Sequence, residues 1–106
     1  MYIVVLVTAS SKEEAVKISN GLLENKLAAC VNILQGVSSF FWWEKKIDQA
    51  NECLMIIKSK KSLLNKIIKK VKSLHSYQVP EIIALPIIGG IKSYLKWIDE
   101  SVRRNS

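Results

Sequence analysis

The sequence is poor in the residues on which most enzymatic chemistry depends. It has one histidine (His75), two cysteines, two prolines and four glycines among 106 residues. It has no Ser-His-Asp arrangement and no close pair of carboxylates on a distinctive segment, and Gly89-Gly90 does not form a phosphate-binding loop. These absences predict a protein that is not an enzyme and has no organic cofactor.

Long hydrophobic runs are also absent. None approaches the roughly 20 residues that a transmembrane helix needs. The apolar run over residues 2–7 is too short for a signal-peptide core and has no basic segment before it. We therefore expect a cytoplasmic protein without a membrane partner. In such a reducing compartment, Cys30 and Cys53 are expected to be buried free thiols.

Basic residues outnumber acidic ones. The sequence has 16 Lys+Arg and 9 Asp+Glu, so its net charge is +7. Such a charge can attract nucleic acid or an anionic surface. However, the lysine-rich segment 58–72 places most of its lysines opposite the apolar stripe of an expected helix, which is typical of a solvated face. RNA-recognition modules carry aromatic residues on their inner strands, and the expected inner strands here are aliphatic. The sequence therefore argues against nucleic acid as a partner.

The hydrophobic spacing predicts an α+β chain folded as a single domain over residues 1–106. Strands are expected over 2–8, 27–34, 47–58 and 81–86, with helices over about 11–25 and 64–74 and from about 91. Residues 37–43 continue the second strand beyond a bulge at Gly36, and 44–46 form the hairpin tip. The order β-α-β-β-α-β with an extra C-terminal helix is the ferredoxin-like pattern, whose first and third strands are central.

Finer features can be predicted for individual elements. Ser10 or Ser11 is expected to cap the first helix, and Ser59 or Ser62 the second. The apolar run 82–85 predicts a strand buried on both faces. Five apolar residues recur at helical spacing in the last helix: Ile91, Tyr94, Leu95, Ile98 and Val102.

Four consecutive aromatic residues, 40–43, occupy the expected hairpin. Side chains alternate across a strand, so Phe40 and Trp42 point to one face, and Phe41 and Trp43 point to the other. A single helical layer covers only one of these faces. One aromatic pair can simply be exposed, but the run favours a subunit interface, because each large aromatic side chain buries roughly 150–250 Å².

The most distinctive segment runs from His75 to Ile98. It contains His75-x-Tyr77-x-x-Pro80-Glu81 and, further on, Tyr94-Leu-x-Trp97-Ile. Together with the ordered strands, these motifs resemble the CutA family of divalent-cation-tolerance proteins over nearly the whole chain. The resemblance implies a ferredoxin-like homotrimer in which long hairpins pair between subunits. It also implies a link to divalent metal tolerance, usually of copper, and a subunit interface or ligand cleft that involves Tyr77, Trp97 and residues 40–43.

The sequence departs from the family pattern at three positions. Lys45 stands where the family has a glycine at the hairpin tip, which suggests a different turn type. Val7 and Leu74 stand where some members have a cysteine and a histidine linked to copper. His75 and Glu81 are then the candidate ligands for a divalent cation, Cu or Zn.

One chain supplies too few ligands for such a metal, so any binding is expected to be weak or to occur at a subunit interface. In the alternative interpretation, His75 stabilises the end of the preceding helix and Tyr77 seals the core. A trimer of this fold also resembles the nitrogen-regulatory P-II signalling proteins, which makes small-molecule sensing the alternative function.

Overall fold

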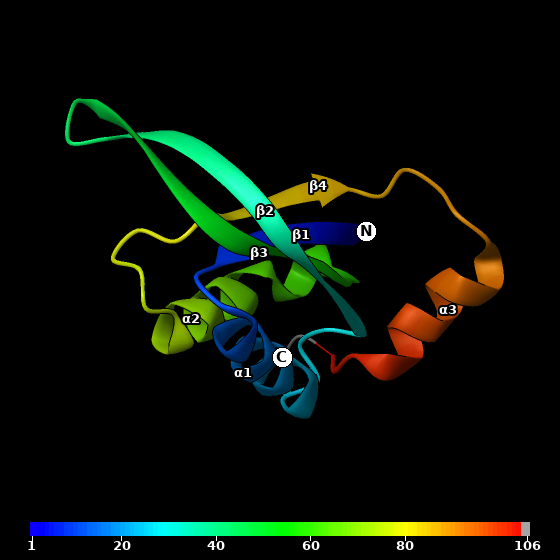
Figure 1. Ribbon diagram of the computed structural model, residues 1–106. Helices are drawn as coiled ribbons and strands as arrows, with labels where there is room; N and C mark the ends of the chain where they lie inside the picture. Colours follow the sequence, from blue (N-terminus) through cyan, green and yellow to red (C-terminus); the bar gives the residue numbers. More distant parts are fainter. Residues whose placement is uncertain (105–106) are drawn as a thin grey trace.

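The structure is a computed structural model that describes residues 1–104. Four strands form one antiparallel sheet in the order β2-β3-β1-β4, and α1 and α2 lie side by side on one of its faces (Figure 1). The elements are β1 (Tyr2–Ala9), α1 (Lys12–Glu24), β2 (Cys30–Trp43), β3 (Lys46–Lys60), α2 (Leu64–Leu74), β4 (Ile82–Pro86) and α3 (Lys92–Ser101). The predicted ferredoxin-like order, with the first and third strands at the centre, is confirmed.

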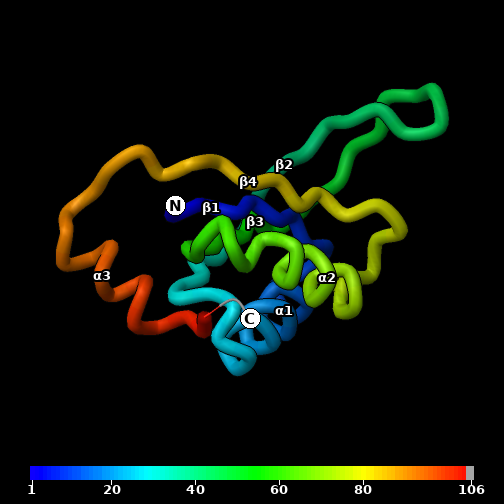
Figure 2. Tube along the Cα trace, turned by 180° about the vertical axis from the view of Figure 1, so that it is seen from behind, coloured from blue at the N-terminus to red at the C-terminus, as the bar shows by residue number. Residues whose placement is uncertain are grey.

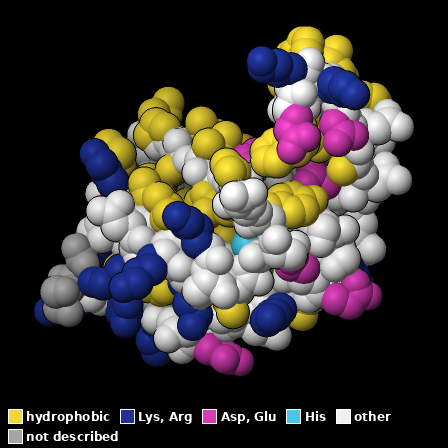
Figure 3. All heavy atoms as spheres, turned by 90° about the vertical axis from the view of Figure 1, so that its left-hand side faces the viewer, with side chains coloured by type: hydrophobic (Ala, Val, Ile, Leu, Met, Phe, Trp, Pro, Cys, Tyr) yellow, Lys and Arg dark blue, Asp and Glu magenta, His cyan; other side chains and the backbone are white. Residues whose placement is uncertain are grey.

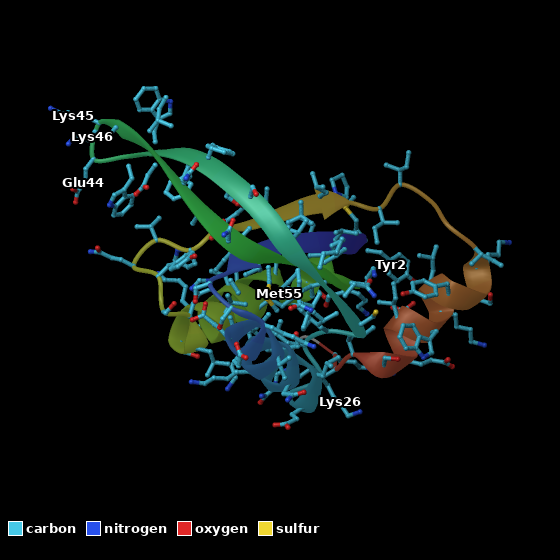
Figure 4. The ribbon with its side chains drawn as sticks, viewed as in Figure 1. Tyr2, Lys26, Glu44, Lys45, Lys46 and Met55 are labelled. Carbon is cyan, nitrogen blue, oxygen red and sulfur yellow. The ribbon has the colours of Figure 1, made fainter. Side chains whose placement is uncertain are left out.

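The core lies between the sheet and the two helices. Along β1, Val5 and Val7 are fully buried while Leu6 between them is only partly covered, because alternate side chains of a strand point to opposite faces. Met55 of β3 is fully buried on the helix side (Figure 4). The helices contribute buried residues at helical spacing: Ala15, Ile18, Leu22, Ile67 and Val71. Each large apolar side chain buried here contributes roughly 1.5–3 kcal/mol.

The ends of α1 follow known capping rules. The Ser11 Oγ accepts a hydrogen bond from the Glu14 N–H at 3.1 Å, which confirms the predicted cap. At the other end, Lys26 adopts a left-handed conformation with φ 54°. The N–H of Leu27 donates to the carbonyl of Leu22, five residues earlier, at 2.9 Å. This pattern is a Schellman motif that uses lysine where glycine is usual.

The predicted cap of α2 is wrong. Neither Ser59 nor Ser62 caps it; a short 3₁₀ turn, Lys61–Leu63, leads into the helix without a side-chain cap. The Ser59 hydroxyl is fully buried and donates to the carbonyl of Leu27 at 2.6 Å instead. This bond ties the end of β3 to Leu27, three residues before β2 begins.

The second face of the sheet is apolar but open. Ile83 and Leu85 are 51% and 50% exposed, so the prediction that β4 is buried on both faces is wrong for the single chain. The reason is that α1 and α2 cover only the other face, while α3 lies beyond the end of the sheet (Figure 2). In α3 and just after it, Ile98 and Val102 are buried, but Ile91 remains 72% exposed.

The β2-β3 hairpin projects from the body as a long arm (Figures 1 and 2). The strand register shifts between Leu34 and Val37, which confirms the predicted bulge at Gly36, where φ is 75°. The turn consists of Glu44 and Lys45 only, since Lys46 already pairs with Trp43. Both turn residues have positive φ, 49° and 65°, as in a type I′ turn.

Both cysteines are free thiols, as predicted. Cys30 pairs with Lys58 across the β2-β3 ladder, and Cys53 pairs with Ala9 across the β1-β3 ladder. Cys30 lies on β2 opposite Lys58, five residues along β3 from Cys53, so the two thiols do not face each other. Cys53 is buried as predicted, but the prediction that Cys30 is buried is wrong, because Cys30 lies on the sheet face that α1 and α2 leave open.

Replacing Lys45 with glycine is expected to stabilise the protein. Lys45 has φ 65°, a conformation that costs a non-glycine residue about 1 kcal/mol or more, and glycine relieves this strain at some cost in unfolded-state entropy. The melting temperature of Lys45→Gly, measured by circular dichroism, is expected to rise by a few degrees. The matched control, Lys46→Gly, lies in strand β3 and is expected to melt lower. A Lys45→Gly protein that melts at or below the wild-type temperature contradicts this assignment.

Candidate functional site

A cleft of about 780 Å³ lies between the hairpin arm and the connection from α2 to β4. In Figure 3, acidic and hydrophobic side chains gather where the projecting arm meets the body. The arm supplies the aromatic residues 40–43 together with Asp48 and Glu52, and the connection supplies Tyr77 and Glu81. The cleft therefore combines aromatic walls with carboxylates.

The strand register arranges the arm side of this cleft. Phe41 pairs directly with Asp48, and Val37 pairs with Glu52. Residues directly opposite each other in an antiparallel pair share a face, so Phe41, Asp48 and Glu52 lie on the same side of the arm. The aromatic residues of this face, Phe41 and Trp43, are 39% and 46% exposed, whereas Phe40 and Trp42 on the other face are about 70% exposed.

A hydrogen bond crosses the base of the cleft. The Tyr77 hydroxyl donates to the Glu52 Oε2 at 2.7 Å. Burial raises the pKa of Tyr77 well above its ordinary value, and the hydrogen bond to Glu52 and the negative charge of Glu52 raise it further. The hydroxyl therefore keeps its proton. Glu52 is only 8% exposed. We did not identify Glu52 from the sequence, although an isolated carboxylate directly before the apolar run 53–57 is a usable signal of a paired, buried acid.

His75 lies behind the cleft wall, and its side chain is fully buried. Its Nε2 is 2.6 Å from the carbonyl oxygen of Thr8, and its Nδ1 is 3.0 Å from the backbone nitrogen of Tyr77. A carbonyl can only accept and a backbone N–H can only donate, so the ring is the neutral tautomer with its proton on Nε2. Both ring nitrogens are therefore engaged within the chain.

Glu14 supports the same segment from α1. Its Oε2 accepts a hydrogen bond from the Ser76 N–H at 2.9 Å, and its Oε1 lies 3.8 Å from the His75 Nδ1. Burial alone would raise the pKa of Glu14, but the hydrogen bonds that its carboxylate accepts from Ser76 and Ser10 together lower it. The stability contributed by a lowered carboxyl pKa is present above the unfolded-state value and is lost as pH falls through the folded-state value.

The structure divides the predicted site residues into three groups. Tyr77, Glu81 and residues 40–43 line the cleft together. His75 lies beside Tyr77, with ring centroids 4.7 Å apart, but is not part of the cleft lining. Trp97 lies on α3 against Tyr94, away from the cleft.

The geometry also bears on the alternative roles of the signature residues. Tyr77 is only partly buried and lines the cleft, so it does not seal the core. The His75 ring binds the end of β1 rather than the last carbonyls of α2. Within residues 1–104, no three His, Cys, Asp or Glu residues form a group that could hold a metal ion. The metal site at His75 and Glu81 stays a prediction that requires ligands from another subunit.

A ferredoxin-like sheet with a long hairpin arm and a terminal helix defines the structural class of this protein. Residues 3–101 match the profile of the CutA1 divalent ion tolerance protein family, and the chain belongs to that family. No helix within residues 1–104 has the length and apolar character required to cross a membrane.

Related proteins come from archaea, bacteria and plants. The divalent-cation tolerance protein CutA of Archaeoglobus fulgidus is 49% identical, over 96% of this chain and 99% of that protein. The solved structure of the divalent cation tolerance protein (Cut A1) from Thermus thermophilus is 42% identical with a TM-score of 0.95, covering 97% of this chain and all of that one. The chloroplastic protein CutA 1 of rice is 47% identical over 97% of this chain. The chain spans only 58% of that rice protein.

The hydrogen bond between Tyr77 and Glu52 is expected to stabilise the fold measurably. A double-mutant cycle of Tyr77→Phe, Glu52→Gln and the double variant isolates this interaction. Hydrogen bonds to charged groups contribute about 1.5–3 kcal/mol, so we expect a coupling energy of about 1.5 kcal/mol or more in urea unfolding. A coupling energy near zero would show that the two side chains do not interact in solution.

Proposed function

We propose that this protein acts as a cytoplasmic homotrimer in the tolerance of, or response to, divalent metal ions, with copper as the principal ion. Its role is to bind rather than to catalyse. The observation that carries this proposal is membership of the divalent ion tolerance family over residues 3–101. Relatives in which the whole protein matches, including those of A. fulgidus and T. thermophilus, carry divalent-cation tolerance in their names.

The exposed apolar surface supports assembly into a trimer. The open sheet face, the hairpin arm and the segment before α3 all expose large apolar side chains: Leu34, Phe40, Trp42, Ile47, Ile83, Leu85, Ile88 and Ile91. Apolar surface of this extent is typical of protein–protein interfaces. Strands β2 and β4 are also the two edges of the sheet, and such edges can pair with another chain.

A subunit interface is also the place where a metal site becomes feasible. Glu81 is exposed at the cleft and has no hydrogen bond or ion pair within the described part of the chain. Divalent ions need several ligands, and a trimer repeats each carboxylate three times. For His75 to coordinate a metal, its ring must release either Thr8 or the Tyr77 N–H. We therefore propose Glu81 as the accessible ligand and His75 as a ligand gained only on rearrangement.

A second candidate function is small-molecule sensing, as in P-II-like trimers. The supporting observation is the cleft itself, whose volume of about 780 Å³ lies within the range of small-molecule sites. Its lining combines apolar walls with a few polar groups, which is the usual composition of such sites.

The metal proposal can be tested by titrating Cu²⁺ and Zn²⁺ into the purified oligomer by calorimetry. We expect weak binding that falls at least about tenfold in Glu81→Gln, because the variant loses a charged ligand at each site. His75→Ala is expected to weaken binding as well if the ring joins the site. The control Glu13→Gln removes an exposed carboxylate of α1 and is expected to bind as wild type does.

Two outcomes would contradict this proposal. Light scattering on the same sample is expected to give three times the 12.0 kDa chain mass, and a mass near 12.0 kDa rules out the trimer. Equal metal affinity in wild type, Glu81→Gln and His75→Ala rules out the proposed ligands.

A further inference from the structure

We propose that the cleft between the hairpin arm and the α2–β4 connection binds an organic ammonium ion. The cation is held between aromatic faces and attracted by the surrounding carboxylates. This inference rests on the second candidate function, small-molecule binding in the cleft, and names the chemical class of the ligand.

Negative charge is concentrated at this cleft. The chain has a net charge of +7, yet three of its nine acidic residues, Asp48, Glu52 and Glu81, line this one cleft. Among residues 1–104, no lysine or arginine is part of the lining. The electrostatic field in the cleft therefore favours a cation and disfavours an anion. The carboxylates repel an anionic ligand, and the low-dielectric walls strengthen this repulsion.

An aromatic surface lies beside these carboxylates. Phe41 and Trp43 lie on the face of the arm that carries Asp48 and Glu52, and Tyr77 faces them from the connection. The face of an aromatic ring attracts a cation within about 6 Å of its centroid, and tryptophan does so most strongly. Aromatic walls with a nearby carboxylate are the usual means of recognising alkylated ammonium groups.

The arrangement of the carboxylates suits an organic cation better than a metal ion. The carboxylates of the cleft do not converge on one point, since no group of three among the described residues could hold a metal. Glu52 is moreover held by the Tyr77 hydroxyl at 2.7 Å. Metal ions require oxygen ligands at about 2.0–2.6 Å, whereas an alkylated ammonium ion spreads its charge over a larger surface. Dispersed carboxylates and apolar walls suit the larger, weakly hydrated ion.

A neutral apolar ligand fits this cleft less well. It would cover Asp48 and Glu81 without compensating their charge, and the burial of an unpaired carboxylate is costly. A ligand with both an apolar surface and a positive charge satisfies the two kinds of wall at once.

The test compares choline with 3,3-dimethylbutan-1-ol, its neutral isostere, on the purified oligomer. Binding is followed by NMR shifts of cleft residues and by tryptophan fluorescence. We expect choline to bind at least about fivefold more tightly than the isostere, the ratio that a cation–π contact of about 1 kcal/mol supplies. Asp48→Asn and Trp43→Leu are each expected to weaken choline binding severalfold. The matched controls Glu13→Gln and Trp97→Leu lie outside the cleft and are expected to leave it unchanged.

Each outcome decides one part of the proposal. Equal affinity for choline and the isostere overturns the cation inference but leaves the cleft as a small-molecule site. Failure of both probes to bind overturns the inference together with the second candidate function. Choline binding that survives unchanged in both Asp48→Asn and Trp43→Leu places the cation elsewhere and overturns the assignment to this cleft.

Discussion

The hydrogen bonds of the buried His75 ring hold together the part of the molecule on which the cleft depends. Through Nε2–H the ring binds the Thr8 carbonyl near the end of β1, and through Nδ1 it accepts the N–H of Tyr77. Glu14 fixes the intervening residue, Ser76, from the first turn of α1. These bonds tie a short connection to the sheet and to a helix. As a result, Tyr77 lies over Glu52.

This arrangement explains why the only histidine of the chain lies at the site without lining it. Its ring positions the cleft wall, while Tyr77 and Glu81 present their side chains to the cleft. An imidazole that binds a metal needs an exposed nitrogen lone pair, whereas an imidazole that positions a chain segment needs hydrogen bonds at both nitrogens. The geometry of the single chain matches the second need.

The order of the strands, the central position of the first and third strands and the bulge at Gly36 could be predicted from the sequence, because hydrophobic period and turn chemistry are local signals. The predicted α2 cap failed because the buried Ser59 hydroxyl binds a carbonyl from a distant segment. Glu52 was missed for a similar reason, since its partner lies 25 residues away. The apolar run of β4 predicts burial on both faces, and the face that α1 and α2 leave open can be buried only by another subunit.

At the hairpin turn, the conformational preference of one residue conflicts with the geometry of the whole arm. Lysine at position 45 suggested a different turn type, but the arm requires positive φ at both turn residues to match the twist of its strands. The geometry of the long ladder therefore overrides the preference of one residue. Local preference and tertiary structure disagree here, and the tertiary structure determines the backbone.

The most direct test of this account is the protonation of the His75 ring, measured by long-range ¹H–¹⁵N correlation NMR at about pH 8, where histidine side chains are neutral. Because the sequence has only one histidine, the two ring signals need no assignment. The account predicts a single neutral tautomer with the proton on Nε2, donated to Thr8. A proton on Nδ1, or the averaged signals of a ring that exchanges freely between tautomers, would contradict it.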